Sequence, residues 1–357
     1  MLYFRLLLVR PVAVLVQFKK RETMQVEPTS DITPASDALE VRLPHRLRLL
    51  NQEERAKLWL RIRRNWQLYV LLFLPLLWLV VFRYAPMYGA QIAFRDYSPA
   101  FGIEGSPWVG FANFERFFNS FYFKPVIINT LVLSFYSLIA GFPIPIILAL
   151  SLNQVKTRLF RNSVQMITYA PHFISTVVIV GMLFQFLHPR VGFTASLANL
   201  FGMAPPNAMG DPGAFRHIFV WSGIWQEMGF NAIIFLAVLS TIDPALHEAA
   251  VVDGASRLQR IRYIDIPGLM PTAMVLLVLT TGRVLEIAFE KVYLMQSPLN
   301  LSVAEVINTY VYKVGLLSPV LDFSYSTAIG LLKGFVGLLL LIAVNHAARR
   351  MTGNSVW

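Results

Sequence analysis

The residues that could carry out catalysis are few in this chain and are not grouped as an active site requires. His247 and Glu248 begin the zinc-binding pattern His-Glu-x-x-His, but Val251 stands where the second histidine is needed. The sequence has no Gly-x-x-x-x-Gly-Lys-Ser/Thr loop for nucleotide phosphates, no cysteine, and only scattered histidines. It therefore predicts no metal site, no cofactor and no enzymatic activity in this chain itself.

Polar residues within apolar stretches are better candidates, because ionisable groups in a membrane usually face an aqueous path or a partner. One group combines aromatic rings with amides and a carboxylate, as sugar sites do: rings pack on C–H faces, and planar polar groups bind hydroxyls. Its members are Trp221, Trp225, Gln226, Glu227 and Asn231. We interpret this group as a candidate substrate pathway. The alternative is that the tryptophans are anchors at a membrane boundary.

Three more ionisable residues fall within apolar stretches. Arg283 and Glu286 are three positions apart, which places them on one face of a helix. They either belong to the pathway or neutralise each other. A buried Arg283 would help to offset the charge of an acidic ligand, which is a hypothesis. Lys333 either extends to the membrane surface or pairs with another subunit.

A polar loop, 241–268, carries the signals of ordered structure between two apolar stretches. Asp243 suits a helix N-cap with Pro244 at the first helical position, and Gly254 suits the left-handed residue that ends a helix. Ser256 then caps a second short helix, which Pro267 is expected to close as the chain re-enters the membrane. A passive connector needs no such order, so the loop is predicted to be a rigid contact surface for another protein.

Long apolar stretches position these residues. The chain of 357 residues is 56% hydrophobic and 14% charged, whereas a soluble protein carries about 25% charged residues. Several stretches are long enough to cross a hydrocarbon layer of about 30 Å as helices. They are 67–82, 126–152, 164–187, 217–240, 269–289 and 327–347. The predicted fold class is an all-α integral membrane protein with about six core transmembrane helices.

Lysine and arginine are distributed unevenly about these stretches. Of the 31, 21 lie before the first stretch, after the last, or in the 153–163 and 241–268 loops. The predicted outer loops, 83–125, 188–216 and 290–326, hold 8, and the remaining 2 lie within stretches. Positive charge marks the cytoplasmic face, so both termini and the loop 241–268 are predicted to be cytoplasmic. The net charge of +11 is then a signal of topology. No basic–aromatic groove pattern indicates nucleic-acid binding.

The N-terminal region precedes the predicted membrane domain, 67–350. Residues 1–50 join an apolar stretch to a polar, proline-containing segment that we expect to be flexible. The apolar part is compatible with a seventh span, an interfacial helix, a signal peptide or sequence upstream of a true start at Met24. Residues 51–66 are basic and amphipathic, and they predict a lead-in helix on the inner membrane surface.

The loop 241–268 resembles the EAA loop of binding-protein-dependent ABC importer permeases. That pattern is Glu-Ala-Ala, three residues, Gly, nine residues, Ile-x-Leu-Pro; here it reads Glu248-Ala249-Ala250, Gly254 and Ile264-Asp-Ile-Pro267. The resemblance implies a type I importer transmembrane domain, in which this loop is the coupling helix seated in a groove of an ATPase subunit. The residues it implies for coupling are Glu248, Ala249, Ala250, Asp253, Gly254, Arg257 and Pro267.

Outer segments resemble the carbohydrate branch of that family, which includes permeases for maltose and for alginate or pectin oligosaccharides. These segments are 84–94 and 106–114, and Asn129-Thr130-Leu131 at the start of the second stretch fits the same pattern. The resemblance implies a second homologous permease, two ATPase subunits that bind ATP and Mg²⁺, and a periplasmic or lipid-anchored solute-binding protein. It also implies contact with lipid and a place in the bacterial cytoplasmic (inner) membrane. The cargo that it implies is an oligosaccharide, and the preferred hypothesis is an acidic one that contains uronic acid.

Other functions are compatible with parts of this pattern. The same machinery imports amino acids, phosphate or metals in other members of the family. An ion-driven secondary transporter should show repeated halves with broken helices around a midplane site, and the sequence shows no convincing repeat. A membrane scaffold or sensor without transport would leave the ordered loop unexplained.

Overall fold

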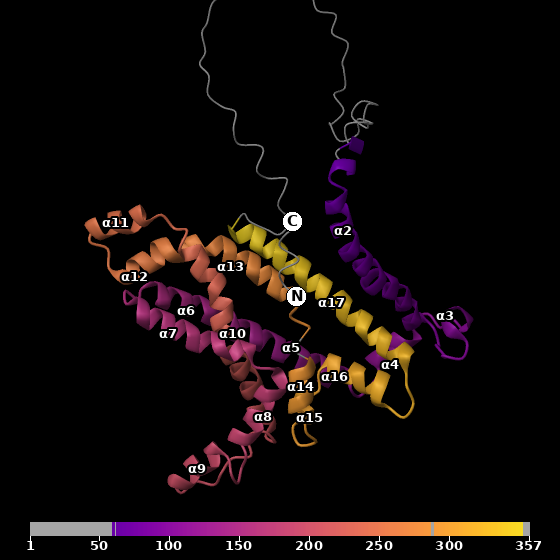
Figure 1. The fold of residues 1–357 in the computed structure, drawn as a ribbon. Coiled ribbons are helices and arrows are strands. Elements are labelled where there is room, and N and C mark those ends of the chain that lie inside the picture. The colour runs from indigo at the N-terminus through magenta and orange to yellow at the C-terminus, as the bar shows by residue number, and fades with distance from the viewer. Residues whose placement is uncertain (1–58, 61, 287–288, 353–357) are drawn as a thin grey trace, which may run out of the picture. The chain divides into compact units, whose positions relative to one another are not determined.

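The computed structural model describes residues 59–60, 62–286 and 289–352 (Figure 1). The chain divides into two units, Met1–Leu72 and Phe73–Trp357, and each is described by itself. The described residues are largely helical; instead of strands they contain an isolated bridge between Arg95 and Trp108. The predicted all-α class is confirmed. The predictions for 1–50 and for most of the lead-in helix 51–66 fall outside the described residues, although 62–64 are helical.

Helices follow one another closely, and short π- or 3-10-helical segments (η) join several of them. In chain order they are α2 (Trp66–Leu79), η2 (Val80–Tyr84), η3 (Ala85–Phe94), α3 (Gly102–Gly105), α4 (Ala112–Phe118), α5 (Phe123–Gly141), α6 (Pro143–Asn153), α7 (Arg158–Tyr169), η4 (Ala170–Phe173), α8 (Thr176–Phe186), α9 (Phe193–Leu200), α10 (Pro212–Leu239), α11 (Pro244–Val252), α12 (Arg257–Arg260), η5 (Ile261–Asp265), α13 (Ile266–Thr281), α14 (Phe289–Met295), α15 (Leu301–Ala304), α16 (Ile307–Tyr312), η6 (Lys313–Leu317) and α17 (Phe323–Thr352).

By length and composition, 5 helical stretches of the described chain can cross a membrane, and a bent pair raises the number to 6. The continuous stretches are Trp66–Phe94, Phe123–Asn153, Pro212–Leu239, Arg257–Thr281 and Phe323–Ala347. Five of the predicted spans therefore overlap a continuous helix. No residue of α2 is buried, which is compatible with a helix surrounded by lipid or by another subunit.

The third predicted span, 164–187, is wrong as a single straight helix. Arg158–Phe173 and Thr176–Phe186 instead meet at 101°. Pro171 lacks an N–H, and the chain tightens to a 3-10 turn there before Ile174 becomes extended. Ser175 then caps α8, with its hydroxyl accepting a hydrogen bond from the Val178 N–H at 3.4 Å. A proline followed by a serine cap thus produces the bend.

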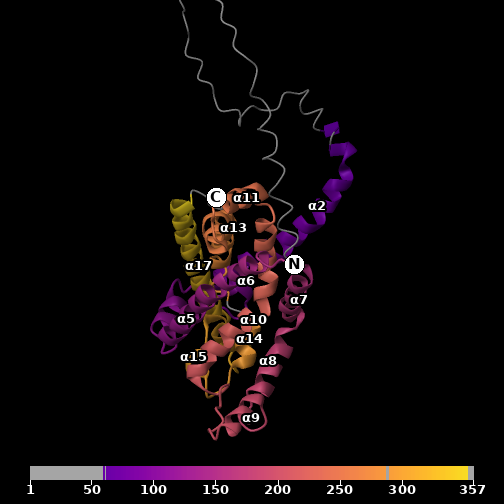
Figure 2. The same cartoon turned by 90° about the vertical axis from the view of Figure 1, so that its left-hand side faces the viewer.

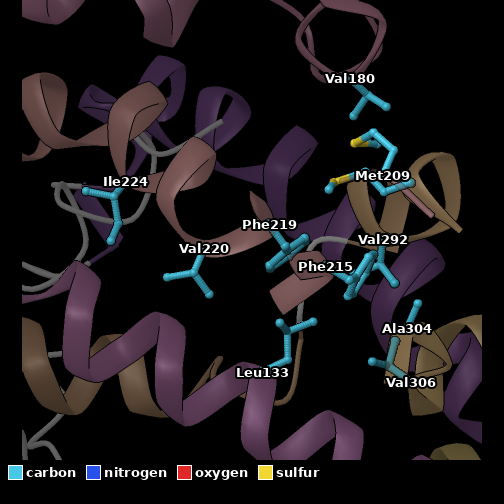
Figure 3. Packing of buried hydrophobic residues seen from close by; sticks show 11 residues of the cluster. Leu133, Val180, Met209, Phe215, Phe219, Val220, Ile224, Val292, Ala304 and Val306 are labelled. Atoms are coloured by element: carbon cyan, nitrogen blue, oxygen red, sulfur yellow. The ribbon is translucent and has the colours of Figure 1, made fainter. Parts of the chain in front are cut away.

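The long helix α10 forms the centre of the packing in Phe73–Trp357, with α5, α6, α7 and α13 against it. Its residues Phe215, Phe219 and Val220 form a buried cluster with Leu133 of α5 and Val292 of α14 (Figure 3). Exposed positions of α10 such as Ile233 and Ile234 are apolar as well, as expected where a helix meets lipid tails. Hydrophobic periodicity alone therefore does not show which face packs.

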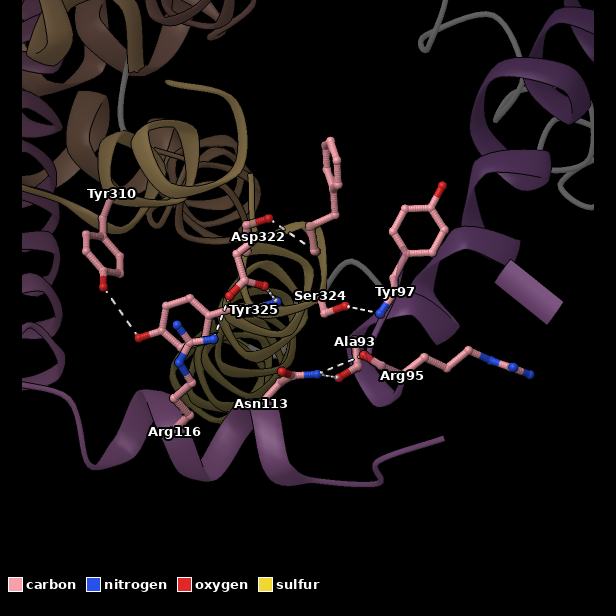
Figure 4. Close-up of polar contacts among 11 residues, drawn as sticks. Ala93, Arg95, Tyr97, Asn113, Arg116, Tyr310, Asp322, Ser324 and Tyr325 are labelled. Atoms are coloured by element: carbon pink, nitrogen blue, oxygen red, sulfur yellow. Dashed lines mark hydrogen bonds and ion pairs between the residues drawn. The ribbon is translucent and has the colours of Figure 1, made fainter. Parts of the chain in front are cut away.

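The N-terminal end of α17 is fixed by polar contacts to segments far away in sequence (Figure 4). The Tyr97 N–H donates to Ser324 Oγ at 2.8 Å. Arg116 forms an ion pair with Asp322, and its guanidinium lies 4.4 Å from the ring centre of Tyr325. The predicted outer loop 83–125 is therefore an ordered part of the domain that packs on the last span.

The two ends of this unit differ in what they carry. The views in Figures 1 and 2 agree that α11 lies at one end, together with the C-terminal end of α17. The helices α9 and α15 lie at the opposite end. The loop 241–268 and the C-terminal end of the last span thus share one side, which is the arrangement that the charge count predicts.

Candidate functional site

The loop 241–268 presents an ordered, exposed helix. α11 begins at Pro244, and the Asp243 carboxylate accepts a hydrogen bond from the Ala245 N–H at 2.9 Å. No residue of α11 is buried, and its apolar side chains include Leu246, 54% exposed, and Val252, 87% exposed. Apolar side chains grouped on an exposed, ordered helix are typical of a surface that another protein covers.

The turn after α11 is fixed by its own hydrogen bonds, as the sequence predicts. Gly254 has φ +77°, the left-handed conformation that a side chain disfavours. The Ala255 N–H then donates to the Ala250 carbonyl at 2.8 Å. Ser256 and Gln259 cap each other: the Gln259 N–H donates to Ser256 Oγ at 3.3 Å, and the Ser256 N–H donates to Gln259 Oε1 at 2.7 Å. The two short helices α11 and α12 therefore hold a set angle.

Apart from Pro267, which lies in α13, the residues predicted to take part in coupling lie on α11, in this turn or at the start of α12. Most of them are exposed, and Ala250 is half-buried. The exposed members are Glu248, Ala249, Asp253, Gly254, Arg257 and Pro267. Their exposure leaves them available to a partner protein, which is what the predicted role requires.

Pro267 does not close the second helix, so that prediction is wrong. α12 passes through the π-helical turn Ile261–Asp265 directly into α13, and Arg257–Thr281 is continuous. A proline inside an α-helix would lack one hydrogen bond and would clash with the carbonyl four residues earlier. The wider π turn lies just before Pro267 and removes that conflict. The loop is thus joined to the fifth predicted span as one rigid rod.

A buried carboxylate ties α11 to this rod. The Asp265 side chain is fully buried, with Oδ1 3.3 Å from Nε2 of His247 in α11. Its Oδ2 accepts a hydrogen bond from Gln154 Nε2, at the C-terminal end of α6, at 3.2 Å. Asp265 therefore joins the exposed helix to two spans. Asp265 was not among the predicted site residues, although an aspartate at the start of an apolar stretch is itself a signal of a specific partner.

Breaking this contact should destabilise the domain in a context-dependent way. We expect His247→Ala to lower the free energy of unfolding by about 1–3 kcal/mol, because it leaves a buried carboxylate with one partner fewer. The same change should cost clearly less in an Asp265→Asn background, where no charge remains to be paired. Thermal unfolding of the purified complex measures both. Equal costs in the two backgrounds would contradict the contact, and Tyr263→Phe, an exposed change on the same segment, serves as the control.

A cavity of about 420 Å³ lies beside α10, within the size range of small-ligand pockets. Three residues of the predicted substrate pathway line it: Gln226, Glu227 and Asn231. Its other walls come from α5, α6, α8, α13 and α14, and they are mostly apolar. The cavity thus combines apolar walls with a few polar groups, as ligand sites do.

The bend of the third span is clamped onto α10 beside this cavity. His172 Nδ1 lies 2.9 Å from Glu227 Oε2, and its ring stacks on Phe230 with centroids 3.8 Å apart. Gln226 Nε2 donates to the Ile174 carbonyl at 3.1 Å. Gln226 and Glu227 therefore serve two roles: they line the cavity, and they hold the bend in place.

Comparisons with known proteins decide the family. Residues 141–353 match the family of binding-protein-dependent transport system inner membrane components. The chain belongs to this family. It is a permease component, and the predicted resemblance is confirmed.

One relative of this permease is named for a polysaccharide transport system. It is 39% identical to the polygalacturonan/rhamnogalacturonan transport system permease protein YteP of Bacillus subtilis (strain 168), over 87% of this chain and 96% of that one. It is 40% identical to protein LplB of the same organism, over 81% and 90% of the two chains. A solved chain of a bacterial alginate ABC transporter, in complex with an alginate pentasaccharide-bound periplasmic protein, is 40% identical with a TM-score of 0.77, over 84% and 100%.

The two tryptophans of the predicted pathway lie outside the cavity lining of the permease. Trp221 is 52% exposed and Trp225 42% exposed on α10. Trp221 Nε1 donates to Tyr136 Oη at 3.0 Å, and that hydroxyl lies 2.8 Å from His217 Nδ1. Both roles considered for the tryptophans, cargo contact and boundary anchor, fit their exposure.

Arg283 and Glu286 do not share a helical face, because α13 ends at Thr281, so that expectation is wrong. Both are exposed, no side-chain ion pair joins them in the described structure, and neither lines the cavity.

Lys333 Nζ donates to Asn308 Oδ1 at 2.9 Å, a partner within this chain. A cation that the sequence analysis had placed in an outer loop, Lys291, lines the cavity instead. No group of three or more metal-binding side chains gathers in the described residues.

Proposed function

We propose that this permease carries an acidic oligosaccharide, one that contains uronic acid, across the bacterial inner membrane as part of an ATP-driven importer. Support comes from identity of about two-fifths to a permease whose name includes polygalacturonan and to a chain of an alginate transporter. The observation that carries the proposal is the capped, exposed α11 at one end of the spans, which is fully ordered although it buries no residue of its own.

The proposed assembly places this chain beside a second, similar permease, above two ATPase subunits, with a solute-binding protein on the opposite face. Both termini lie in the cytoplasm in this proposal, in accordance with the distribution of positive charge. The groups Glu248–Ala249–Ala250, Asp253, Gly254 and Arg257 contact the ATPase. ATP and Mg²⁺ belong to the ATPase subunits, and this chain needs no cofactor of its own.

Alternating access follows from the way the coupling loop is attached. α11 is joined through Asp265 to the start of α13 and to the end of α6. Closure of the ATPases would move α11 as a rigid element, and the move would pass to both spans as a rigid-body rotation. The cavity beside Glu227 would then open to one side of the membrane and afterwards to the other.

Reconstitution tests this function. The complex of both permeases and the ATPase, in proteoliposomes with its binding protein, should take up trigalacturonate or an alginate trisaccharide only with ATP. ATP-dependent uptake of an amino acid or phosphate instead would support the importer mechanism but contradict the proposed oligosaccharide cargo. Uptake driven by an ion gradient without ATP would overturn the importer. An assembly that forms without ATPase subunits would also overturn it.

A further inference from the structure

Lys291 is a buried cation that sequence analysis had counted in an outer loop. It lies in α14, its side chain is 4% exposed, and it lines the cavity together with Gln226 and Glu227. Its ammonium donates to the Phe219 carbonyl at 3.2 Å and lies 5.2 Å from the centre of the Phe219 ring. Within the described chain, no carboxylate lies within 4.0 Å of this ammonium.

Burial of the Lys291 ammonium is costly, because its charge leaves water with no carboxylate in direct contact; Glu227, which lines the same cavity, acts on it electrostatically from beyond 4.0 Å. One carbonyl also uses only one of the three hydrogen bonds that an ammonium can donate. Such a group persists in a packed domain for a functional reason more often than for stability. The nearest acidic candidate, Glu227, is engaged by His172 at 2.9 Å.

Gly223 keeps the ammonium next to open space. A Cβ atom at position 223 would lie 3.3 Å from Lys291 Nζ, which is tighter than an ordinary contact. Gly223 also lines the cavity. The glycine on α10 therefore leaves room for the lysine head beside the cavity that both residues line.

We propose that Lys291 binds the carboxylate of a uronic acid residue while the oligosaccharide passes through this permease. The inference rests on the proposed function and names the group that recognises the acidic cargo. Amides are the matching partners for sugar hydroxyls, and Gln226 and Asn231 supply them in the same cavity. Arg283, the cation first considered for this role, is exposed outside the cavity.

Two substitutions separate the charge from the side-chain stem. Lys291→Met keeps an unbranched stem and removes the charge, and Lys291→Arg keeps the charge. In the complete complex, we expect Lys291→Met to lower trigalacturonate uptake about tenfold and Lys291→Arg to retain at least about half of it. Because Lys291→Met removes the cost of a buried charge, it should leave the unfolding midpoint unchanged or raise it, so lower uptake is not explained by a loss of folding. Gly223→Ala should lower uptake to an intermediate value. Lys333→Met, which removes another lysine of this unit, is the control and should leave uptake unchanged.

The outcomes are distinguishable. Uptake that survives in Lys291→Met, or that is lost equally in Met and Arg variants, overturns the role of the charge. The methyl ester of trigalacturonate has no carboxylate, so Lys291→Met should take it up at the same rate as the unchanged protein. If Lys291→Met loses as much uptake of the ester as of the free acid, the role of the Lys291 charge is also overturned. If the unchanged complex takes up no saccharide at all, the proposed function fails instead.

Discussion

Replacement of Gly229 by alanine is expected to separate the third span from α10. A Cβ atom at this position would lie 2.1 Å from the backbone carbonyl oxygen of Thr168 and 2.4 Å from its carbonyl carbon. Backbone atoms of a helix cannot move aside as a flexible side chain can, so α7 must shift as a whole. Overpacking typically costs about 1–3 kcal/mol, and a backbone clash belongs at the upper end. We expect a lower unfolding midpoint and loss of most transport.

A matched control makes the cause clear. Gly181→Ala adds the same methyl group on α8, where no heavy atom lies within 4 Å of the added carbon. It should leave the unfolding midpoint unchanged or raise it slightly, because alanine favours a helix more than glycine does. If both variants behave alike, the close approach of α7 to α10 is not what sets stability here.

Gly254→Val is expected to uncouple the permease from the proposed ATPase partner. The residue has φ +77°, and a left-handed conformation costs an ordinary residue about 1–2 kcal/mol, with β-branched residues worst. No heavy atom lies within 4 Å of a Cβ at this position, so the strain is in the backbone alone. The turn between α11 and α12 should open, and ATP-driven uptake should fall by about tenfold or more.

Asparagine at position 254 distinguishes backbone strain in the turn from a steric conflict with the ATPase surface. Gly254→Asn tolerates the left-handed conformation and should retain most uptake, since its side chain projects into open space. The measurement is uptake per ATP hydrolysed in proteoliposomes. Equal loss with valine and asparagine would mean that an ATPase surface, not the turn, requires glycine. No loss with either would contradict the coupling role of this loop.

The structural elements that depend on local chemistry were predictable from sequence. Asp243, Gly254 and Ser256 cap or end helices through atoms a few residues away, so their types and spacing were sufficient. The bend at Pro171 and the continuous helix through Pro267 were not predicted. In both cases the proline is visible, but whether the chain breaks or widens into a π turn depends on the helices packed around it.

The sequence by itself determined the all-helical membrane class, the approximate spans and the ordered loop, because hydrophobic length and capping residues act within one segment. Only the tertiary structure decided which polar residues meet. It placed Lys291 and Glu227 at one cavity and Asp265 against His247. Arg283 is exposed and belongs to neither the cavity nor that contact. The physical reason is that apolar side chains also cover the lipid-facing sides of membrane helices, so hydrophobicity alone does not show which faces pack together.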